Sequence, residues 1–358
     1  MLLTCPSVLA EFPLCGKPVS AEPTGCGHIN RTYLVKTDAG KEYLLQSINT
    51  NVFPDVDRLM DNICLVTAHL REKILAAGGD PERETLTVVS AKDGQSFVRD
   101  RDGCWRVYLY IGDAVTLQSA GKPEVFYKAA KAFGRFQSQL EDFPAEKLFP
   151  VIPDFHNTPK RLRDLWAAVE ADPLGRVKEV LPEITFFKER EAFAATLENA
   201  GLPLRVTHND TKLNNLLFDG ATMEPLCVID LDTIMPGSSL YDFGDCIRFG
   251  AATAAEDEKD LSKVTCDLAL FEAFTKGWLE ACGAAMTDAE KRLLPESARI
   301  LTLECGSRFL ADYILGDTYF AIQRPGQNLD RARTQIKLVQ DMEAKEAKMR
   351  AIVEKYEK

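Results

Sequence analysis

The stretch Val206-Thr-His-Asn-Asp-Thr-Lys-Leu-Asn-Asn-Leu-Leu217 decides how this chain is interpreted. It places His208 two residues before Asp210, and Asn215 five residues after Asp210. Val228-Ile-Asp-Leu-Asp232 follows, a short apolar run that ends in carboxylates. Short apolar runs bounded by polar residues are typical of buried strands. The pattern therefore predicts a polar loop between two short strands, with Asp230 leaving the second strand.

This spacing is typical of the catalytic loop and metal strand of kinase-type phosphotransferases. Phosphoryl transfer needs a carboxylate near the nucleophilic hydroxyl and a Mg²⁺ ion that bridges the phosphates. Asp210 would accept the hydroxyl proton, and Asn215 and Asp230 would hold Mg²⁺ on ATP. His208 is expected to act as a scaffold inside the loop. The first hypothesis is a kinase that uses ATP and Mg²⁺ and acts on a small molecule.

A second motif, Asp242-Phe-Gly244, spells the metal-binding DFG sequence of protein kinases. Its place in the chain argues against that role, because Asp230 already follows a buried strand directly after the catalytic loop. Asp242 begins a stretch of helical character, residues 241–249. We therefore expect Asp242 to cap that helix or to brace the loop.

Composition limits the class of protein. The chain has 358 residues, enough for two lobes, and its 46% hydrophobic and 27% charged content is that of a soluble globular protein. A net charge of −11 argues against nucleic acid or an anionic membrane as the main partner. No apolar run approaches ~18 residues, so no transmembrane helix is expected. The expected ligands are a small substrate and ATP, with no protein partner implied.

The cysteines and the N-terminus bear on the compartment. None of the 10 cysteines forms a CxxC pair, and with only 4 histidines a zinc site is disfavoured. Several cysteines lie in apolar segments, which fits a reducing environment. The first residues lack the basic region of a signal peptide. The expected location is the cytoplasm.

Residues 1–112 have the pattern of a β-rich lobe. A hairpin is predicted from strands at 29–37 and 43–48, followed by a helix at 57–77 that Gly78-Gly79 ends. Further strands are predicted at 86–89 and 105–111. This order is what the N-terminal, nucleotide-binding lobe of a kinase needs.

Residues 113–358 have mainly helical periodicity, interrupted by the β-rich stretch 204–232 that holds the opening motif. We predict an α+β, bilobal, protein-kinase-like fold whose second lobe carries the catalytic loop, the metal ligands and the acceptor site. The predicted helices are 125–140, 158–171, 182–201, 240–252, 257–282, 295–321 and 329–358.

Taken together, these motifs resemble the aminoglycoside phosphotransferase and choline kinase superfamily, and within it the bacterial N-acetylhexosamine 1-kinases. The resemblance spans nearly the whole chain. It implies phosphorylation of the anomeric hydroxyl of N-acetylglucosamine or N-acetylgalactosamine by ATP, giving the hexosamine 1-phosphate. Besides the opening loop, it rests on Gly25-Cys-Gly-His-Ile-Asn-Arg-Thr-Tyr-Leu-Val35, Asn49-Thr-Asn-Val-Phe-Pro-Asp55, Ile229-Asp-Leu-Asp-Thr-Ile-Met-Pro-Gly237 and Arg333-Thr-Gln-Ile-Lys-Leu-Val-Gln340.

The resemblance also implies roles for individual residues. The catalytic base is Asp210, which also contacts the acceptor, and the Mg²⁺ ligands are Asn215 and Asp230. The residues expected to bind the nucleotide are Gly25 and Gly27 in the nucleotide loop and Asn30 close to a phosphate. The residues expected to bind the sugar are His28, Arg308 and Tyr319. Separately from the resemblance, we expect the adenine to hydrogen-bond the backbone near Tyr110 and Ile111, where the last strand of the first lobe meets the connection.

Two of the sugar-site residues have plainer interpretations. Glu304, Arg308 and Asp312 fall at i, i+4 and i+8 of a predicted helix and could form a surface row of ion pairs worth ~0.5 kcal/mol each. The apolar residues around them indicate instead that this face is partly buried. Tyr319, an aromatic at helical spacing, could be a core residue.

The chain departs from the general kinase pattern in its second predicted strand, residues 43–48. The strand that normally carries the ATP-contacting lysine has Gln46 in that region and no lysine at the expected position. Either Gln46 substitutes as a neutral hydrogen-bond donor, or another cation such as Arg31 or Lys36 contacts the phosphates.

Two alternatives stay open. The first is a kinase of another small alcohol, such as choline, homoserine or an aminoglycoside. Choline would need an aromatic cage, and an aminoglycoside would need an acidic cleft, for which the acidic residues between 256 and 260 are available. The second is a catalytically dead nucleotide-binding regulator, which the missing lysine favours and the intact catalytic loop opposes.

Overall fold

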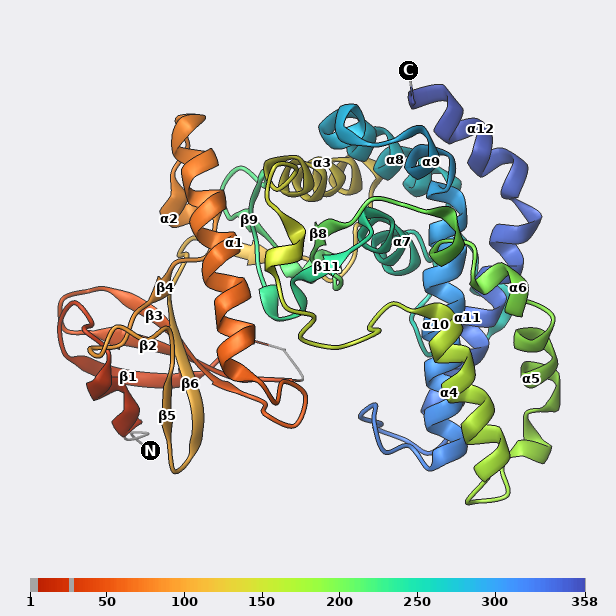
Figure 1. Ribbon diagram of the computed structural model, residues 1–358, viewed down its shortest axis with the longest axis horizontal. Coiled ribbons are helices and arrows are strands. Elements are labelled where there is room, and N and C mark those ends of the chain that lie inside the picture. Colours follow the sequence, from red (N-terminus) through yellow and green to blue (C-terminus); the bar gives the residue numbers. More distant parts are fainter. Residues whose placement is uncertain (1–5, 26–28, 358) are drawn as a thin grey trace. The chain divides into compact units, whose positions relative to one another are not determined.

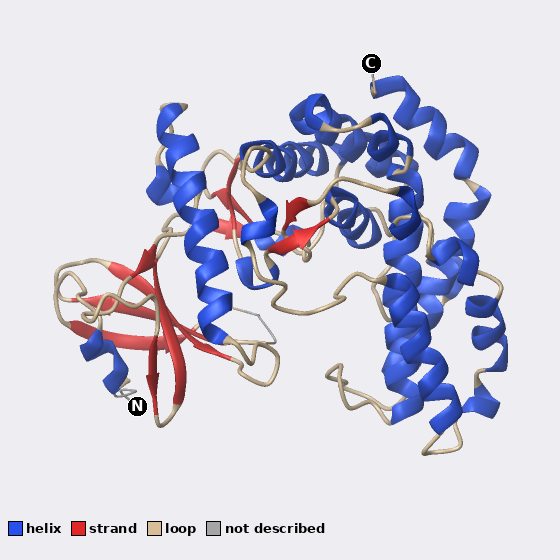
Figure 2. Ribbon diagram, in the orientation of Figure 1, coloured by secondary structure: helices blue, strands red, loops and turns tan. Residues whose placement is uncertain are grey.

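The structure is a computed structural model that describes residues 6–25 and 29–357. The chain divides into two compact units (Figure 1). The sheet unit comprises Met1–Thr116, Asp142–Ile152 and Leu216–Pro236, and the helical unit comprises Leu117–Glu141, Pro153–Asn215 and Gly237–Lys358. Strands predominate in the N-terminal region and helices in the C-terminal region, which confirms the predicted α+β class (Figure 2).

An antiparallel sheet with the strand order β1–β2–β3–β6–β4 forms the first part of the sheet unit, and β5 also pairs with β6. The hairpin predicted between 29 and 48 is the β2–β3 pair. The strands are β1 Pro18–Pro23, β2 Arg31–Thr37, β3 Glu42–Ile48, β4 Val88–Val89, β5 Val98–Asp100 and β6 Gly103–Leu109.

The two faces of this sheet carry different side chains, one apolar and one with polar and charged groups. Side chains alternate along β3, so Tyr43 and Leu45 join a buried apolar cluster with the 3-10 helix η1 (Ser7–Glu11). Gln46 and its cross-strand neighbour Arg106 share the other face. The guanidinium Nη1 of Arg106 lies 3.9 Å from the sulfur of Met60 on helix α1.

Helix α1 (Val56–Ala76) begins where Asp55 caps it by accepting the N–H of Arg58, and it ends before Gly78, whose φ is +78°. One buried polar residue on α1, Asn62, joins the separate segments of the sheet unit. Its amide donates to the carbonyls of Phe149 (2.7 Å) and Ile234 (2.9 Å), and its oxygen accepts the Phe149 N–H (2.9 Å).

A smaller antiparallel sheet, β10–β9–β7, completes the sheet unit. It is formed by β7 Ala114–Thr116, β9 Leu216–Asp219 and β10 Pro225–Val228, and β9, which begins at the end of the opening motif, pairs with both of the others. The chain leaves β10 through Asp230 into the 3-10 helix η6 (Leu231–Thr233).

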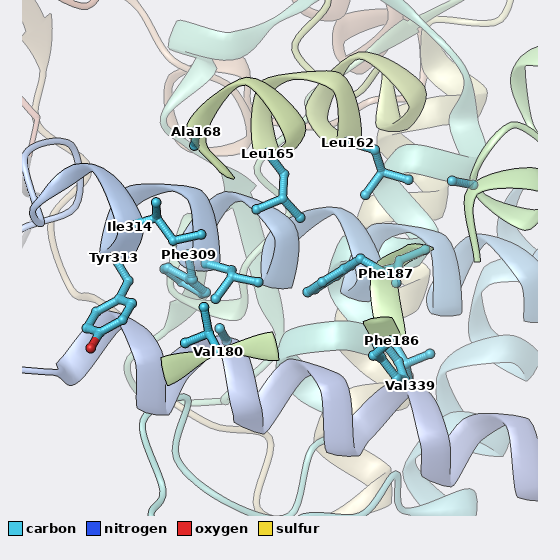
Figure 3. Packing of buried hydrophobic residues seen from close by; sticks show 14 residues of the cluster. Leu162, Leu165, Ala168, Val180, Phe186, Phe187, Phe309, Tyr313, Ile314 and Val339 are labelled. Atoms are coloured by element: carbon cyan, nitrogen blue, oxygen red, sulfur yellow. The ribbon is translucent and has the colours of Figure 1, made fainter. Parts of the chain in front are cut away.

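The helical unit is built around α10 (Leu294–Leu315), which is buried on nearly every side. Residues of α4 (Thr158–Ala171), α10 and α11 (Gln327–Ala344) meet in one apolar cluster that includes Leu165, Phe309 and Val339 (Figure 3). The remaining longer helices are α3 Pro123–Gln139, α5 Leu181–Lys188, α7 Ser239–Gly250, α8 Leu268–Cys282 and α12 Glu346–Tyr356. In the described part of the chain, every helix is too short or too polar to cross a bilayer.

The predicted helices were too long in four places, one of which is the stretch 329–358, which is divided into α11 and α12 at Lys345. The stretch 257–267 is a loop with one 3-10 turn, η7 (Leu261–Lys263), and α8 begins only after Asp267 caps it. The predicted helix 182–201 is broken into α5, α6 (Glu191–Ala194) and η4 (Glu198–Ala200). The helix predicted to 321 ends at Leu315 because Gly316 adopts a φ of +104°.

Replacing Asn62 with alanine should lower the free energy of unfolding by about 2 to 4 kcal/mol, because three backbone groups lose their partner in a buried setting. Urea denaturation followed by tryptophan fluorescence measures the change. Glu72→Ala on the exposed side of α1 is the control and should stay within ~0.5 kcal/mol of the wild type. An equally small effect at Asn62 would contradict its linking role.

Candidate active site

The loop after strand β8 (Arg205–Thr207) is turned sharply at Asn209, whose φ of +64° lies in the left-handed region. His208 is completely buried, and its ring contacts Phe133 and Phe136 of α3 edge-on. The N–H of Asp210 donates to Nδ1 of His208 at 3.2 Å. His208 is therefore a scaffold residue, as its position in the motif indicated.

Asp242, on the first turn of α7, braces this loop. Its carboxylate accepts the N–H groups of His208 (3.0 Å) and Asn209 (2.7 Å) and the side-chain amide of Gln137 (2.6 Å). Its backbone carbonyl also accepts the hydroxyl of Thr211 at 2.7 Å. Burial raises the pKa of Asp242, although these donors oppose the shift. The hydrogen bonds fit the bracing role expected for Asp242, while Ser238 caps α7.

The loop presents Asp210 next to Asn215, at the end of the 3-10 turn η5 (Leu213–Asn215). The amide nitrogen of Asn215 donates to the carbonyl (2.7 Å) and to Oδ2 (3.0 Å) of Asp210. The ammonium of Lys212 lies 3.0 Å from the other carboxylate oxygen, Oδ1. The side chain of Asp210 is 28% exposed, so its carboxylate is oriented by the loop and still accessible.

Lys212 was missed as a functional candidate by the sequence analysis. The Asp-x-Lys spacing within the opening motif was the available signal. A cation beside the carboxylate of Asp210 can stabilise negative charge that develops on a transferring phosphoryl group.

A buried ion pair between His156 and Glu304 contacts the loop at Asn209. His156 binds the carbonyl of Asn209 through Nε2 (2.9 Å) and the carboxylate of Glu304 through Nδ1 (2.8 Å). Thr158 donates to the second oxygen of Glu304 at 3.0 Å. Burial opposes the charge on both groups, but their mutual attraction dominates, raising the pKa of His156 and lowering that of Glu304. These partners lie 148 residues apart, so no local pattern indicated the pair.

Arg308 and Tyr319 lie together in the helical unit. The guanidinium of Arg308 lies 5.4 Å from the ring of Phe155, 5.8 Å from that of Tyr319 and 5.4 Å from that of Phe320. Its Nη2 also donates to the Tyr319 hydroxyl at 3.5 Å. Tyr319 is 65% exposed and follows the end of α10, so it is not the core residue that helical spacing had allowed.

The Glu304, Arg308 and Asp312 row is not a row of surface ion pairs. Glu304 is buried against His156, and the carboxylate of Asp312 accepts the backbone N–H groups of residues 318 to 320. Asp312 thereby fixes the segment that carries Tyr319. We call the set of Phe155, Arg308, Tyr319 and Phe320 the arginine–aromatic cluster.

In the sheet unit, the two carboxylates after β10 differ sharply. Asp230 is exposed and has a left-handed φ of +61°, a costly conformation for a residue other than glycine. Asp232 is buried, and its oxygens contact Asn30 (2.6 Å) and the Nη1 of Arg106 (2.6 Å). Desolvation opposes the charge on Arg106, but the surrounding groups, Asp232 foremost among them, together raise the pKa of Arg106 further. The carboxylate of Asp232 is thus held inside the sheet unit, whereas Asp230 is an exposed residue.

The predicted nucleotide residues are only partly described. Gly25 has a φ of +81°, which suits glycine at the β1–β2 turn. Gly27 and His28 lie outside the described residues. The N–H of Tyr110 already donates to the carbonyl of Glu42 (3.2 Å), and Ile111 is buried. An adenine contact at Tyr110 would therefore have to use its carbonyl.

Each of the three residues proposed to substitute for the strand lysine has a partner within the sheet unit. Gln46 donates to Thr32 and accepts from Arg106, Arg31 lies against Ser47, and Lys36 is exposed beside Glu42. Arg106 is the cation that the structure places next to Gln46, and the sequence analysis did not consider it.

Comparison with known proteins identifies the family of this chain. A family model described as the phosphotransferase enzyme family matches residues 20–267, more than half of the chain, and the chain belongs to that family.

Three solved structures with similar folds share 12% to 16% sequence identity with this chain. A microcompartment-associated aminopropanol kinase (TM-score 0.60, 16% identity, 96% of this chain and 97% of that one) is one of them. An aminoglycoside phosphotransferase from Alicyclobacillus acidocaldarius has the same TM-score and identity, over 99% and 97%. An amicoumacin kinase in complex with AMP-PNP, Ca²⁺ and Ami (TM-score 0.58, 12% identity) covers 92% and 91%. The fold is the protein-kinase-like fold of these phosphotransferases.

The His156–Glu304 pair should make stability depend on pH in a defined direction. The raised pKa of His156 means that its contribution is complete below the unfolded value, about 6.5, and is lost as pH rises through the folded value. The lowered pKa of Glu304 means that its contribution is complete above its unfolded value, about 4.3, and is lost as pH falls through the folded one. The destabilisation caused by His156→Gln should therefore be largest between about pH 5 and 6.5.

Urea denaturation of wild type and His156→Gln from pH 5 to 9 measures this difference, which should shrink toward alkaline pH. His69→Gln is the control, because His69 pairs with Asp142, whose side chain is 61% exposed. A difference at His156 that stays constant over the range would contradict a charged pair.

Proposed function

We propose that this protein is an ATP-dependent kinase that phosphorylates the anomeric hydroxyl of an N-acetylhexosamine. The family assignment supports the phosphotransfer reaction. The observation that carries the substrate class is the arginine–aromatic cluster, which a chain of contacts joins to the catalytic loop. The Phe155 ring lies 4.6 Å from the ring of His156, and His156 binds the carbonyl of Asn209.

In this proposal Asp210 accepts the proton of the acceptor hydroxyl. The oxygen of that hydroxyl bonds to the γ-phosphoryl group of ATP as the bond to ADP breaks. Asn215 and Lys212 orient the two carboxylate oxygens, which is the positioning that phosphoryl transfer requires. An anomeric hydroxyl is more acidic than an ordinary alcohol, so a carboxylate suffices as the base.

Asn215 and Asp230 fit the role of Mg²⁺ ligands by their chemistry, since Mg²⁺ prefers oxygen ligands. The amide nitrogen of Asn215 is committed to Asp210, which leaves its oxygen as the coordinating atom. Asp230 offers an exposed carboxylate on a strained backbone, a conformation that is often found at functional positions. Mg²⁺, when bound, would neutralise charge on the phosphates, and the similar kinase that holds AMP-PNP with Ca²⁺ supports a nucleotide and a divalent cation.

The charge around Arg308 favours a neutral acceptor. Burial lowers the pKa of Arg161, and the positive charge of Arg308 lowers it further. Two cations therefore lie in this region. The rings that could form a cage for choline already surround the guanidinium of Arg308. An acetamido sugar carries carbonyl and hydroxyl oxygens that accept from a guanidinium and has an apolar face for the rings.

The acidic segment that could favour an aminoglycoside is engaged within the protein. Glu256 pairs with Arg248 at 3.0 Å, and Asp257 pairs with Arg324 at 3.2 Å. These contacts weaken the case for an acidic acceptor cleft there. The similarity to an aminopropanol kinase keeps an amino alcohol as the second candidate class, and turnover assays decide between the two.

Asp210→Asn should reduce kcat by about 10²- to 10⁴-fold, the usual effect of losing a general base, while ATP binding is preserved. A coupled assay for ADP release and calorimetric titration with ATP measure the two quantities. Asp164→Asn on the surface of α4 is the matched control. Near-wild-type turnover by Asp210→Asn would refute the assignment.

Among N-acetylglucosamine, N-acetylgalactosamine, unacetylated hexoses, choline, homoserine and an aminoglycoside, an N-acetylhexosamine should give the highest kcat/KM. Arg308→Leu should raise KM for that sugar by about 10- to 100-fold, the value of a charged hydrogen bond, and leave KM for ATP unchanged. Arg163→Leu, exposed on α4, is the control.

Each other outcome of this panel points to a different function. Preference for choline or homoserine would establish the amino-alcohol class. ATP binding without turnover of any acceptor would favour a regulator.

A further inference from the structure

We infer that Arg106 takes the place of the missing strand lysine. It does not contact the phosphates but acts as a positioning residue, which connects Asn30, a predicted nucleotide residue, with the segment that carries Asp230, the predicted metal ligand. The inference rests on the proposed use of ATP and Mg²⁺. It assigns the cation that the sequence left unassigned, and all residues involved belong to the sheet unit.

The location of Arg106 matches that of the missing lysine. Arg106 is directly opposite Gln46 in the β3–β6 register, so its side chain leaves the same face of the sheet. In protein kinases the strand lysine forms an ion pair with a glutamate of the following helix. Here α1 offers the sulfur of Met60 at 3.9 Å instead, and the carboxylate comes from Asp232 on the metal segment.

The guanidinium is held in one orientation. The side-chain oxygen of Gln46 accepts from both Nε (2.9 Å) and Nη2 (2.8 Å), so two hydrogen bonds that converge on one oxygen set the plane of the guanidinium. The ring of Tyr108 lies 5.1 Å from it. Arg106 is 1% exposed, which excludes direct contact with a phosphate in this conformation. Gln46 is therefore an orienting partner of the cation, and a lysine could not use the same two-point contact.

From Arg106 the contacts run to both predicted ligand-binding segments. Asp232 forms an ion pair with Arg106 through Oδ1 at 2.6 Å, and its Oδ2 accepts from the side-chain amide of Asn30 at 2.6 Å. Asn30 in turn accepts the N–H of Asn49 at 3.0 Å. Asp230, the exposed metal candidate, lies two residues before Asp232. One buried charge thus fixes both Asn30 and the turn that presents Asp230.

Asp232 is the second carboxylate of the sequence Asp230-Leu-Asp232, so from the sequence it could be taken for a second metal ligand. Its engagement by Arg106 and Asn30 makes it a supporting residue instead. Groups that orient metal ligands in this way typically change metal affinity by about 10- to 100-fold when they are removed.

The test uses the full-length protein and calorimetric titration with Mg²⁺·AMP-PNP, which needs no acceptor. The main variant is Arg106→Met combined with Asp232→Asn, because removing both charges avoids leaving one of them buried alone. It should bind the nucleotide at least about tenfold more weakly while thermal unfolding stays close to that of the wild type. Arg99→Met on β5, whose side chain is 62% exposed, is the control and should stay within about twofold.

A rescue variant distinguishes the loss of the positive charge of Arg106 from the loss of its side-chain volume. Gln46→Lys combined with Arg106→Met moves the cation to the usual strand position and should recover most of the affinity that Arg106→Met loses. Failure of a folded rescue variant to bind better than Arg106→Met would overturn the role of the charge.

A folded double variant that binds Mg²⁺·AMP-PNP as tightly as the wild type would overturn the inference. If that variant does not fold, Arg106→Lys replaces it, since it keeps the charge but loses the two-point contact with Gln46. Unchanged affinity of Arg106→Lys would likewise overturn the positioning role. If the wild type itself fails to bind the nucleotide, the proposed kinase function fails instead, so the two failures are distinguishable.

Discussion

The carboxylate of Asp242 accepts two successive backbone N–H groups of the loop that carries Asp210, and the geometry of the candidate active site depends on this interaction. The turn at Asn209 has a left-handed backbone, and the N–H groups of His208 and Asn209 donate to the side chain of Asp242. Left unpaired in a buried position, such groups would cost about 1 to 3 kcal/mol each. A carboxylate supplied by α7 removes that cost and holds Asp210 and Asn215 at a fixed spacing.

The same solution recurs around the site. His156 and Glu304 support the other side of the loop, and Arg106 and Asp232 hold the segment that presents Asp230. Buried ion pairs contribute little net stability compared with apolar side chains, because both charges must first be desolvated. Their value here is orientation, since each pair fixes a backbone segment whose polar groups must point in a particular direction.

The arrangement around Gln46 indicates how a kinase-like fold can function without its usual strand lysine. The positive charge has moved one strand across the sheet, and its partner has moved from the following helix to the metal segment. Charge and counter-charge remain on the same face of the sheet. A neutral glutamine at the lysine position is then a requirement of the network, because a second cation there would repel Arg106.

The sequence by itself determined the reaction class and the fold class, because both depend on local patterns. The alternation in β2 and β3, the periodicity of α1 and the spacing of His208, Asp210 and Asn215 are all readable within short windows. Chain order also predicted that Asp242 would cap a helix or brace the loop, and the structure shows the bracing contacts. The errors of the sequence-based predictions arose where a single local feature overrides periodicity, as at Gly316 or in the capped start of α8.

Only the tertiary structure identified the partners that hold these motifs in place. His156 meets Glu304 across 148 residues, Asn30 meets Asp232 across 202, and Arg106 meets Gln46 across 60. Hydrogen bonds and ion pairs between distant segments leave no periodic trace in the sequence, because any buried donor can be satisfied by any acceptor that the fold brings within about 3 Å. The pattern of residues therefore determined the chemistry that the chain carries, and the fold decided which side chains orient it.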